Sequence, residues 1–312
     1  MKAIKLQSEY RYKFQKKEEK DVKHNNENIV INFCPTGMIP TKKKTPHVPI
    51  SINEIIDDVL KVSEIGITMT HLHARDETSG EPTWKADIYA KIIEGIRKFI
   101  PDLIICVSLS GRTFQEFEKR TEPLELTGIH KPDMGSLTLS SLNFNKIASV
   151  NEPEMIKKIA AKMKKRKIKP ELEAFDAGMI NYAKYLIKKE LLTPPYYFNF
   201  ILGNIACAQA DILHSGIMIN DLPENSYWSL GGIGRSQIIM NSLAISVGGG
   251  VRVGLEDNIW LDNKRTKLAS NTDLLKRIHI LAEANEKKIF QPADFRKYLK
   301  LNNGNGLYGL QE

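Results

Sequence analysis

Two histidines separated by one residue are the first feature of this sequence that could do chemistry. His71 and His73 end the β-prone run at residues 67–76. Because side chains alternate along a strand with a period of two, both imidazoles point to the same face. Neutral imidazoles in this arrangement suit Zn²⁺, with other first-row divalent ions possible, and they need a third ligand from elsewhere. The motif is short, so two half-buried histidines on an ordinary strand are the competing interpretation.

An acidic pair offers the third ligand. Glu256 and Asp257 follow the apolar, β-prone segment at residues 251–255. If the strands close into a barrel, this last strand lies beside the first, and catalytic groups gather at the C-terminal ends of barrel strands. Glu256 can then bind the cation and leave an open position for substrate. The sequence thus predicts a metal site made by His71, His73 and Glu256.

Arg252 lies within that same apolar segment. If its guanidinium is buried, it needs a carboxylate partner such as Asp257, whereas an outward-facing arginine would need none. An arginine and aspartate pair beside a Lewis-acidic metal can remove a proton alpha to a metal-bound carbonyl. We therefore predict that Arg252 and Asp257 are catalytic.

Further polar residues stand at the expected strand ends. Alternation puts Glu171, Glu173 and Phe175 on one face, so Glu173 is either an active-site carboxylate or the structural partner of an inward-pointing basic residue. Ser108 and Ser136 could bind a substrate carboxylate through their hydroxyls, although serines at strand ends are also ordinary turn formers. The five other histidines show no ligand spacing and are predicted to be surface or core residues: His24, His47, His130, His214 and His279.

Eight β-prone segments alternate with helical patterns, and these elements must position the candidate residues. The strands are predicted at residues 29–33, 66–73, 103–108, 134–137, 169–175, 196–201, 226–229 and 251–255. The helices are predicted at residues 52–63, 87–100, 153–165, 180–189, 237–246 and 272–285. This count and spacing favour an α/β chain folded as a (β/α)8, or TIM, barrel over a doubly wound open sheet.

Composition bounds the domain organisation. Residues 1–28 are rich in Lys, Glu and Asn, so they are predicted to be a polar extension. No Pro/Gly/Ser-rich linker interrupts residues 29–290, so residues 29–312 are predicted to be one catalytic domain with a C-terminal helix. Residues 304–312 are expected to fray or to pack on a neighbour.

Charge and apolar content bound the location and the partners. The chain has no apolar run long enough to span a membrane and no secretory signal, and its three cysteines lack CxxC spacing, so we expect a cytoplasmic protein with reduced thiols. The net charge of +8 fits an anionic small substrate. A basic nucleic-acid-binding protein is the non-enzymatic alternative, but the lysines are spread over short runs without an aromatic-rich motif, so we expect no nucleic-acid partner.

With these residues in hand, the sequence resembles the β-keto acid cleavage enzymes, a family that contains 3-keto-5-aminohexanoate cleavage enzyme. The resemblance runs from about residue 29 to residue 299. It rests on eight separated stretches: Pro35-Thr36-Gly37, His71-Leu72-His73-Ala74-Arg75-Asp76, Ser108-Leu109-Ser110-Gly111, Lys131-Pro132-Asp133-Met134, Pro170-Glu171-Leu172-Glu173, Phe175-Asp176-Ala177-Gly178-Met179, Gly232-Ile233-Gly234-Arg235 and Gly254-Leu255-Glu256-Asp257-Asn258. Together these stretches are specific, although each alone would be weak.

The resemblance implies a zinc-dependent barrel enzyme in which a β-keto acid and acetyl-CoA give acetoacetate and a new acyl-CoA by a retro-Claisen step. It also implies a homo-oligomer, a dimer or a tetramer. By this analogy the zinc ligands are His71, His73 and Glu256, the substrate-activating pair is Arg252 and Asp257, an active-site glutamate is Glu173, and the substrate-binding residues are Thr36, Gly37, Ser108 and Ser136. A metal-dependent aldolase or hydrolase that uses no coenzyme A is the runner-up.

The sequence departs from the family pattern at two positions. The branch that acts on an amino keto acid carries a glutamate two residues after the Thr-Gly, where this chain has Ile39, and Ser136 replaces a threonine. A glutamate there suits a substrate ammonium group. Ile39, with Met38 beside it, predicts a keto acid with a less polar or differently charged side chain.

Overall fold

The computed structural model describes residues 27–311. Residues 1–26, which make up most of the predicted polar extension, lie outside the described residues. Strand β1 (Asn28–Ile29) pairs in parallel with β12 (Lys288–Ile289). The predicted domain boundary at residue 29 therefore falls inside a strand.

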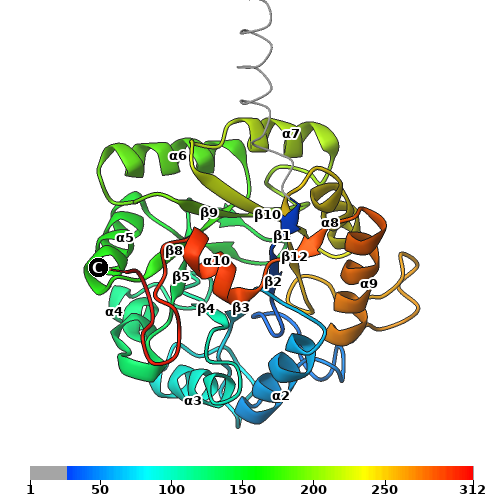
Figure 1. Cartoon of the computed structure of the whole chain (residues 1–312), viewed down its shortest axis with the longest axis horizontal. Helices are drawn as coiled ribbons and strands as arrows, with labels where there is room; N and C mark the ends of the chain where they lie inside the picture. The colour runs from blue at the N-terminus through cyan, green and yellow to red at the C-terminus, as the bar shows by residue number, and fades with distance from the viewer. Residues whose placement is uncertain (1–26, 312) are drawn as a thin grey trace, which may run out of the picture.

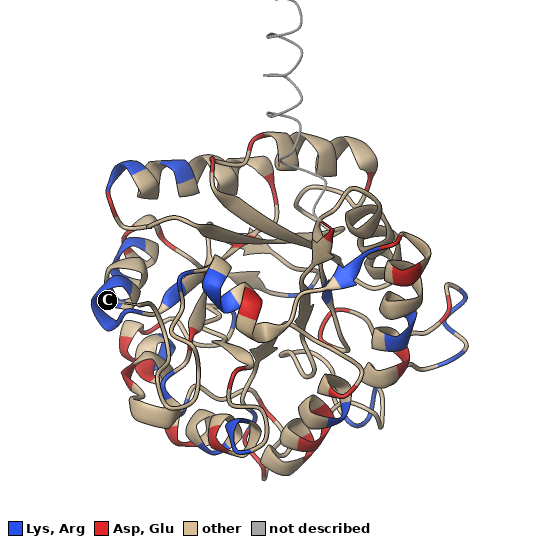
Figure 2. Ribbon diagram, in the orientation of Figure 1, with Lys and Arg blue, Asp and Glu red and all other residues tan. Residues whose placement is uncertain are grey.

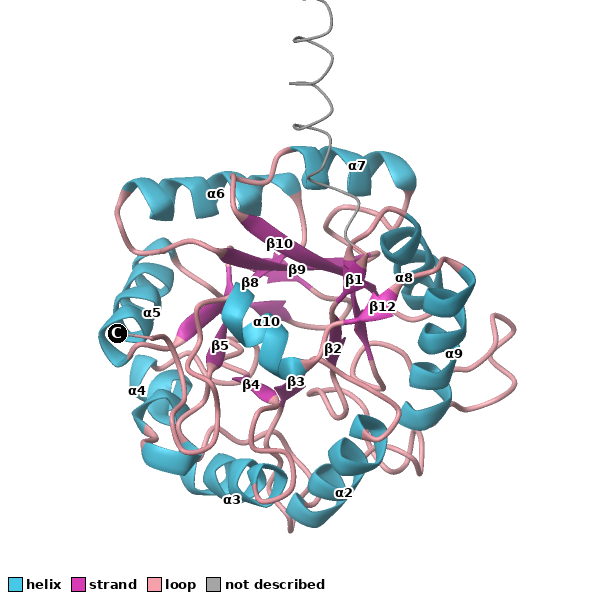
Figure 3. Cartoon of the chain, viewed as in Figure 1, coloured by secondary structure: helices cyan, strands magenta, loops and turns pink. Residues whose placement is uncertain are grey.

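Eight parallel strands close into a barrel (Figures 1 and 3). They are β2 (Ile31–Phe33), β3 (Met69–Leu72), β4 (Ile104–Val107), β5 (Met134–Thr138), β8 (Lys169–Ala174), β9 (Tyr196–Leu202), β10 (Ser226–Gly232) and β11 (Gly250–Val253). Strand β11 pairs with β2, with Arg252 opposite Asn32, and this pairing joins the two ends of the sheet. The closure confirms the predicted (β/α)8 barrel and excludes the open sheet. Each predicted β-prone segment contributes one barrel strand.

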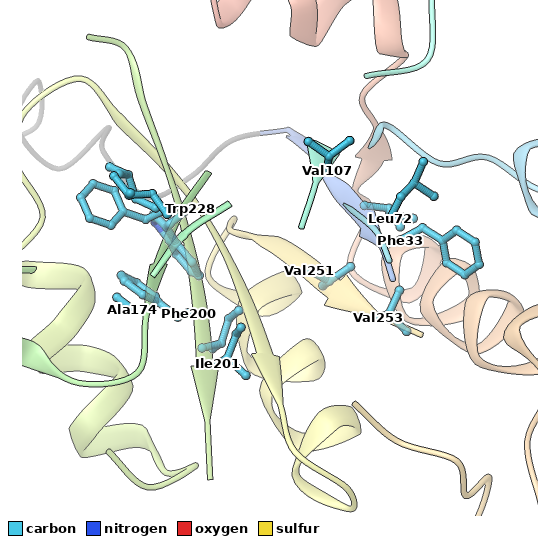
Figure 4. Packing of buried hydrophobic residues seen from close by; sticks show 14 of the residues in the cluster. Phe33, Leu72, Val107, Ala174, Phe200, Ile201, Trp228, Val251 and Val253 are labelled. Carbon is cyan, nitrogen blue, oxygen red and sulfur yellow. The ribbon is translucent and has the colours of Figure 1, made fainter. Parts of the chain in front are cut away.

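Alternation along the strands separates an outer apolar face from an inner polar face. In β2, Ile31 and Phe33 pack in the main hydrophobic cluster, whereas Asn32 between them contacts Glu171 of β8. Figure 4 shows part of this cluster, with Phe33, Val107 and Val253 among its labelled residues. Because strands of a barrel are covered by helices on the outside and packed with side chains inside, even short runs such as these are fully buried.

The helices form a ring around the barrel (Figure 1). They are α2 (Ile52–Ser63), α3 (Ala86–Arg97), α4 (Phe117–Thr121), α5 (Pro153–Arg166), α6 (Ala177–Lys188), α7 (Ile212–Asn220), α8 (Ser236–Ser246), α9 (Asn271–Ala284) and α10 (Pro292–Tyr298). Helix α2 has the predicted bounds, and Ser51 and Glu54 form its capping box. Helix α6 begins three residues before the predicted start because the Asp176 side chain accepts a hydrogen bond from Met179 N and caps it.

Among the elements that were not predicted are three helices and one hairpin. Helix α7 is apolar almost throughout, so it lacks the amphipathic pattern that reveals a helix, and α4 and α10 are only five and seven residues long. The hairpin follows β5 and is made by β6 (Leu142–Asn143) and β7 (Ala148–Ser149). This hairpin forms part of the wall of the active-site cavity described below.

The C-terminal segment corrects one prediction. Residues 304–312 were expected to fray or to pack on a neighbour, but Gly309 N donates to Asp133 Oδ1 at 3.1 Å and Leu310 N donates to Lys167 O at 2.7 Å. The segment therefore packs on its own barrel. Together with α10, it covers the end of the barrel at which the strands begin (Figure 1).

Charged residues of both signs are interspersed over α2, α3, α5 and α9, whereas α7 and α8 carry none (Figure 2). Among the described residues, no helix combines the length and the apolar character needed to cross a bilayer.

Candidate active site

His71, His73 and Glu256 meet at the C-terminal end of the barrel. The two histidine Nε2 atoms are 3.3 Å apart, and His73 Nε2 lies 3.2 Å from Glu256 Oε1. Their candidate ligand atoms all lie within 4.8 Å of one another. The second oxygen, Glu256 Oε2, is buried and has no hydrogen-bond partner within residues 27–311. Two imidazoles and a carboxylate, one of whose oxygens is buried and unsatisfied, fit a single zinc-type cation.

Glu171 orients the first histidine. Its Oε2 lies 2.5 Å from His71 Nδ1, which leaves His71 Nε2 directed toward His73. Burial acts to raise the pKa of Glu171, but the charge and hydrogen bond of His71, the charge of Arg252 and the hydrogen bond from Cys106 together outweigh it and lower the pKa to about 2. Carboxylates that hold the far nitrogen of a metal-binding histidine fix the ring and raise its basicity. Sequence reasoning put Glu171 on the same face as Glu173 but gave it no role.

Three inward side chains complete the surroundings of Glu171. Asn32 Nδ2 donates to Glu171 Oε1 at 2.5 Å and Asn199 Nδ2 donates to the same oxygen at 3.1 Å. Cys106 Sγ donates to Glu171 Oε2 at 3.1 Å. The carboxylate is therefore held from four barrel strands, so it positions His71 rigidly.

Gly37 makes room for Glu256. Its φ is +63°, and a Cβ added there would lie 2.4 Å from Glu256 Cγ. Arg75 fixes the loop around this glycine, because its Nε donates to Gly37 O at 2.8 Å and its Nη2 donates to Pro40 O at 3.0 Å. Thr36 is fully buried. Neither Thr36 nor Gly37 belongs to the wall of the cavity, to which this loop contributes Met38 and Ile39.

The predicted partnership of Arg252 and Asp257 is present. Arg252 Nε donates to Asp257 Oδ2 at 2.7 Å, and Arg252 Nη2 donates to Glu256 Oε1 at 2.6 Å. The arginine is buried, and it lines the cavity inside this end of the barrel. Burial raises the pKa of Asp257, while the neighbouring guanidinium opposes that rise. Arg252 thus holds a metal-ligand candidate and a base candidate side by side.

Glu173, Ser108 and Ser136 separate into different environments. Glu173 and Ser108 line the cavity, and Thr138 Oγ1 donates to Glu173 Oε2 at 2.7 Å. Burial raises the pKa of Glu173. Ser136 does not line the cavity, and its Oγ accepts a hydrogen bond from Leu109 N at 2.9 Å. Ser136 therefore holds the loop after β4 in place. Thr138 was missed because β5 extends one residue beyond its predicted end.

A cavity of about 210 Å³ opens beside these residues. Its polar wall includes His73, Ser108, Glu173, Arg252, Glu256 and Asp257. Leu142 and Phe144, from the hairpin and its turn, line it together with Arg112 of the loop after β4. None of these three was predicted, because the residues after β4 and β5 show no periodicity. Arg235, the last residue of the stretch Gly232-Ile233-Gly234-Arg235, lies in a separate hollow with Trp260 and Arg277.

Sequence comparison decides the family. The model of the beta-keto acid cleavage enzyme family matches residues 28–301. The chain belongs to this family. The predicted resemblance, which ran from about residue 29 to residue 299, is thereby confirmed, and the chain is an enzyme of the β-keto acid cleavage type.

Two relatives align with the chain over almost their whole length. The chain is 35% identical to 3-keto-5-aminohexanoate cleavage enzyme of Fusobacterium nucleatum over 277 residues, which are 88% of this chain and 98% of that protein. It is also 35% identical to 3-oxoadipate:acetyl-CoA acetyltransferase of Cupriavidus necator over 277 residues, 87% of this chain and 94% of that protein. The two relatives share the family while their names give different keto acids.

Solved structures support the fold of this family member. The apo structure of ObcA superposes with a TM-score of 0.71 at 19% identity, over 81% of this chain. The chain spans 65% of the length of ObcA. At this identity the similarity establishes the barrel alone.

Proposed function

We propose that this chain converts a β-keto acid and acetyl-CoA into acetoacetate and a new acyl-CoA, with zinc bound by His71, His73 and Glu256. The observation that carries the proposal is the meeting of these three donors with the Arg252–Asp257 pair at one cavity. The family membership supports cleavage of a β-keto acid. The name of the Cupriavidus necator relative supports acetyl-CoA as the second substrate.

The cation would supply Lewis acidity that withdraws electrons from the substrate keto oxygen. Asp257 accepts the proton from the substrate carbon between the keto and carboxylate groups. Arg252 keeps the Asp257 carboxylate in position. Ser108 offers its hydroxyl to the substrate carboxylate, and beside it Thr138 donates its own hydroxyl proton to Glu173. Ser136, Thr36 and Gly37 support the site by shaping its loops.

The proposed reaction exchanges two acyl groups. The carbanion formed by Asp257 attacks the thioester carbon of acetyl-CoA, and the coenzyme A thiolate leaves. The thiolate then adds to the original keto carbon, and the bond between that carbon and the deprotonated carbon breaks. The departing acetoacetate carbanion regains its proton from Asp257, and the remaining acyl group leaves as its coenzyme A thioester.

A panel of β-keto acids, each incubated with and without acetyl-CoA, tests this function. We expect acyl-CoA and acetoacetate to form in equal amounts and only when acetyl-CoA is present. Turnover that does not depend on acetyl-CoA would contradict the proposal and favour an aldolase or hydrolase.

Two variants test the residues of the site. His71→Ala should lose stoichiometric zinc with the fold retained, whereas Asp257→Asn should keep zinc and lose at least about 100-fold in kcat.

We also propose that the chain forms a homo-oligomer in the cytoplasm. Exposed apolar side chains on α7 and α8, including Ile212, Leu213 and Ile239, fit the expected homo-oligomer because such patches mark association surfaces. Sedimentation velocity of the purified chain measures the state, and a monomer at micromolar concentration would contradict it. Fractionation of cells that express the chain tests the cytoplasmic location.

A further inference from the structure

We propose that Arg112 selects β-keto acids that carry a second negative charge at the far end of the side chain, that is, β-keto dicarboxylic acids. This inference rests on the proposed function and names its substrate class. It starts from a guanidinium that the reaction above does not use.

Arg112 lies on the loop that continues β4. Ser108, Ser110 and Arg112, at alternate positions of this loop, all line the cavity. Ser108 is 9% exposed, while Ser110 and Arg112 are only half-buried, so the line runs outward from the barrel. The guanidinium carbon of Arg112 lies 3.5 Å from the ring centroid of Phe144. Stacking on one face fixes the guanidinium plane and leaves its N–H edge available to a ligand.

Apart from the Phe144 ring, the Arg112 guanidinium has no hydrogen-bond or ion-pair partner in the described part of the chain. Its Nε is buried without a hydrogen bond, and no ion pair joins it to a carboxylate within residues 27–311. A partly desolvated charge without a counter-ion in direct contact is costly, so it marks a place where an anion can bind.

The other charged side chains of the cavity wall already have hydrogen-bond or ion-pair partners. Arg252 is committed to Glu256 and Asp257. Glu173 accepts a hydrogen bond from Thr138. Arg112 is therefore the cation of this wall, within the described residues, that is left for a ligand.

The position of Arg112 favours the far end of the substrate. The keto oxygen and the first carboxylate are only two carbons apart, so both belong near His73, Ser108 and Glu256. Arg112 stands four residues beyond Ser108, next to Phe144. The charges of Glu256, Glu173 and Asp257 reach it only from beyond ion-pair distance. The carbon chain between the two carboxylates would pass along Leu142 and Phe144. Ile39, also on this wall, offers no carboxylate for an ammonium group.

Two keto acids of equal length test the inference. 3-Oxoadipate carries a carboxylate at the far end, and 3-oxohexanoate carries a methyl group there. We expect the wild-type enzyme to prefer 3-oxoadipate, and Arg112→Gln to lose about 10- to 100-fold in kcat/KM for it but less than about threefold for 3-oxohexanoate. Arg112→Lys should retain part of the preference because it keeps the charge without the planar fork. Lys91→Gln, which removes an exposed charge on α3, is the matched control and should leave both values unchanged.

Other outcomes overturn the inference in distinguishable ways. Equal losses for both acids would mean that Arg112 binds the carboxylate they share. A raised KM for acetyl-CoA with both acids would assign Arg112 to the co-substrate. A wild-type preference for 3-oxohexanoate, or an unchanged Arg112→Gln, would remove the role. Calorimetric binding of the two acids without acetyl-CoA keeps the test independent of turnover. If Arg112→Gln binds 3-oxoadipate more weakly than the wild type does but binds 3-oxohexanoate equally well, the inference is supported even if no acyl-CoA forms. If Arg112→Gln binds 3-oxoadipate as tightly as the wild type does, the inference is overturned.

Discussion

Gly37 stands with Glu256 packed against its Cα, at a φ of +63°. Gly37→Ala should therefore displace Glu256 and reduce zinc occupancy, beyond the general strain of a side chain at positive φ. Zinc content by atomic emission, together with urea denaturation, measures both effects. Gly128→Ala is the matched control, because Gly128 has a φ of +57° and a Cβ there would meet nothing within 4 Å. If both variants bind zinc normally, the loop is not what holds Glu256 in place.

Glu171 acts on the cation through His71. Glu171→Gln keeps the size of the side chain but removes the charge that orients His71 Nδ1, so zinc affinity should fall about 10- to 100-fold. Competition with a chromophoric chelator measures it. Glu173→Gln serves as the control, since the Glu173 hydrogen bond goes to Thr138, which is not a ligand candidate, and it should bind zinc as the wild type does. Undiminished zinc affinity in Glu171→Gln would exclude the orienting role.

At the scale of elements, Asn271 joins α9 to α2 and to the loop that carries Glu256. Its Oδ1 accepts from Leu255 N at 2.8 Å, and its Nδ2 donates to Asp58 Oδ2 at 2.5 Å and to Pro35 O at 3.1 Å. Burial raises the pKa of Asp58 to about 6, although the hydrogen bond from Asn271 and the charges of Lys61 and Lys42 oppose it and Glu54 adds to it. This junction should therefore respond to pH.

The raised pKa of Asp58 makes the folded chain less stable as pH rises. A folded-state pKa of about 6 against 3.8 means that folding favours protonated Asp58, so its contribution is complete below about pH 4 and is lost as pH rises through 6. The loss is at most about 3 kcal/mol, and contact with solvent reduces it. Asp58→Asn should become more stable than the wild type at pH 7, and the difference should vanish near pH 4. Urea denaturation at several pH values measures this, with the exposed Asp57→Asn as the control. A pH-independent difference would contradict the assignment.

At the scale of the whole molecule, the two ends of the barrel have separate tasks. Asp133 lies at the end away from the cavity, where its carboxylate accepts from Arg97 Nη2 at 3.1 Å and from Arg296 Nη2 at 2.8 Å. Gly309 N also donates to it. These contacts tie α3, α10 and the C-terminal segment to the start of β5. In barrels of this kind this end serves stability and the opposite end serves chemistry.

Asp133→Ala should leave two buried arginines without their counter-ion and destabilise the chain by about 3–5 kcal/mol. Zinc content of the folded fraction should not change, because the ligand candidates lie at the other end. Chemical denaturation and metal analysis check the two halves of this expectation. Asp294→Ala, which breaks the exposed pair with Lys297, should change stability within the error of the measurement. Equal stabilities of the two variants would show that the Asp133 cluster does not stabilise the barrel.

The sequence alone determined the strands and the residues that stand at their ends. The two-residue period of a strand put His71 and His73 on one face, and the acidic pair after residues 251–255 located Glu256 and Asp257. These features are local, because side-chain alternation and the order of residues can be recognised within one short segment. For the same reason the strand count predicted the barrel, whereas α7, without an amphipathic pattern, was missed.

Tertiary structure alone decided which distant groups meet. Glu171 reaches His71 across 100 residues only because the barrel closes with both side chains inside. Ser136 turns to Leu109 N instead of the cavity, Gly37 packs against Glu256, and Arg112 stacks on Phe144 of the hairpin turn. The closure of the sheet and the conformations of its loops set these contacts, and neither is encoded by the period of a single segment.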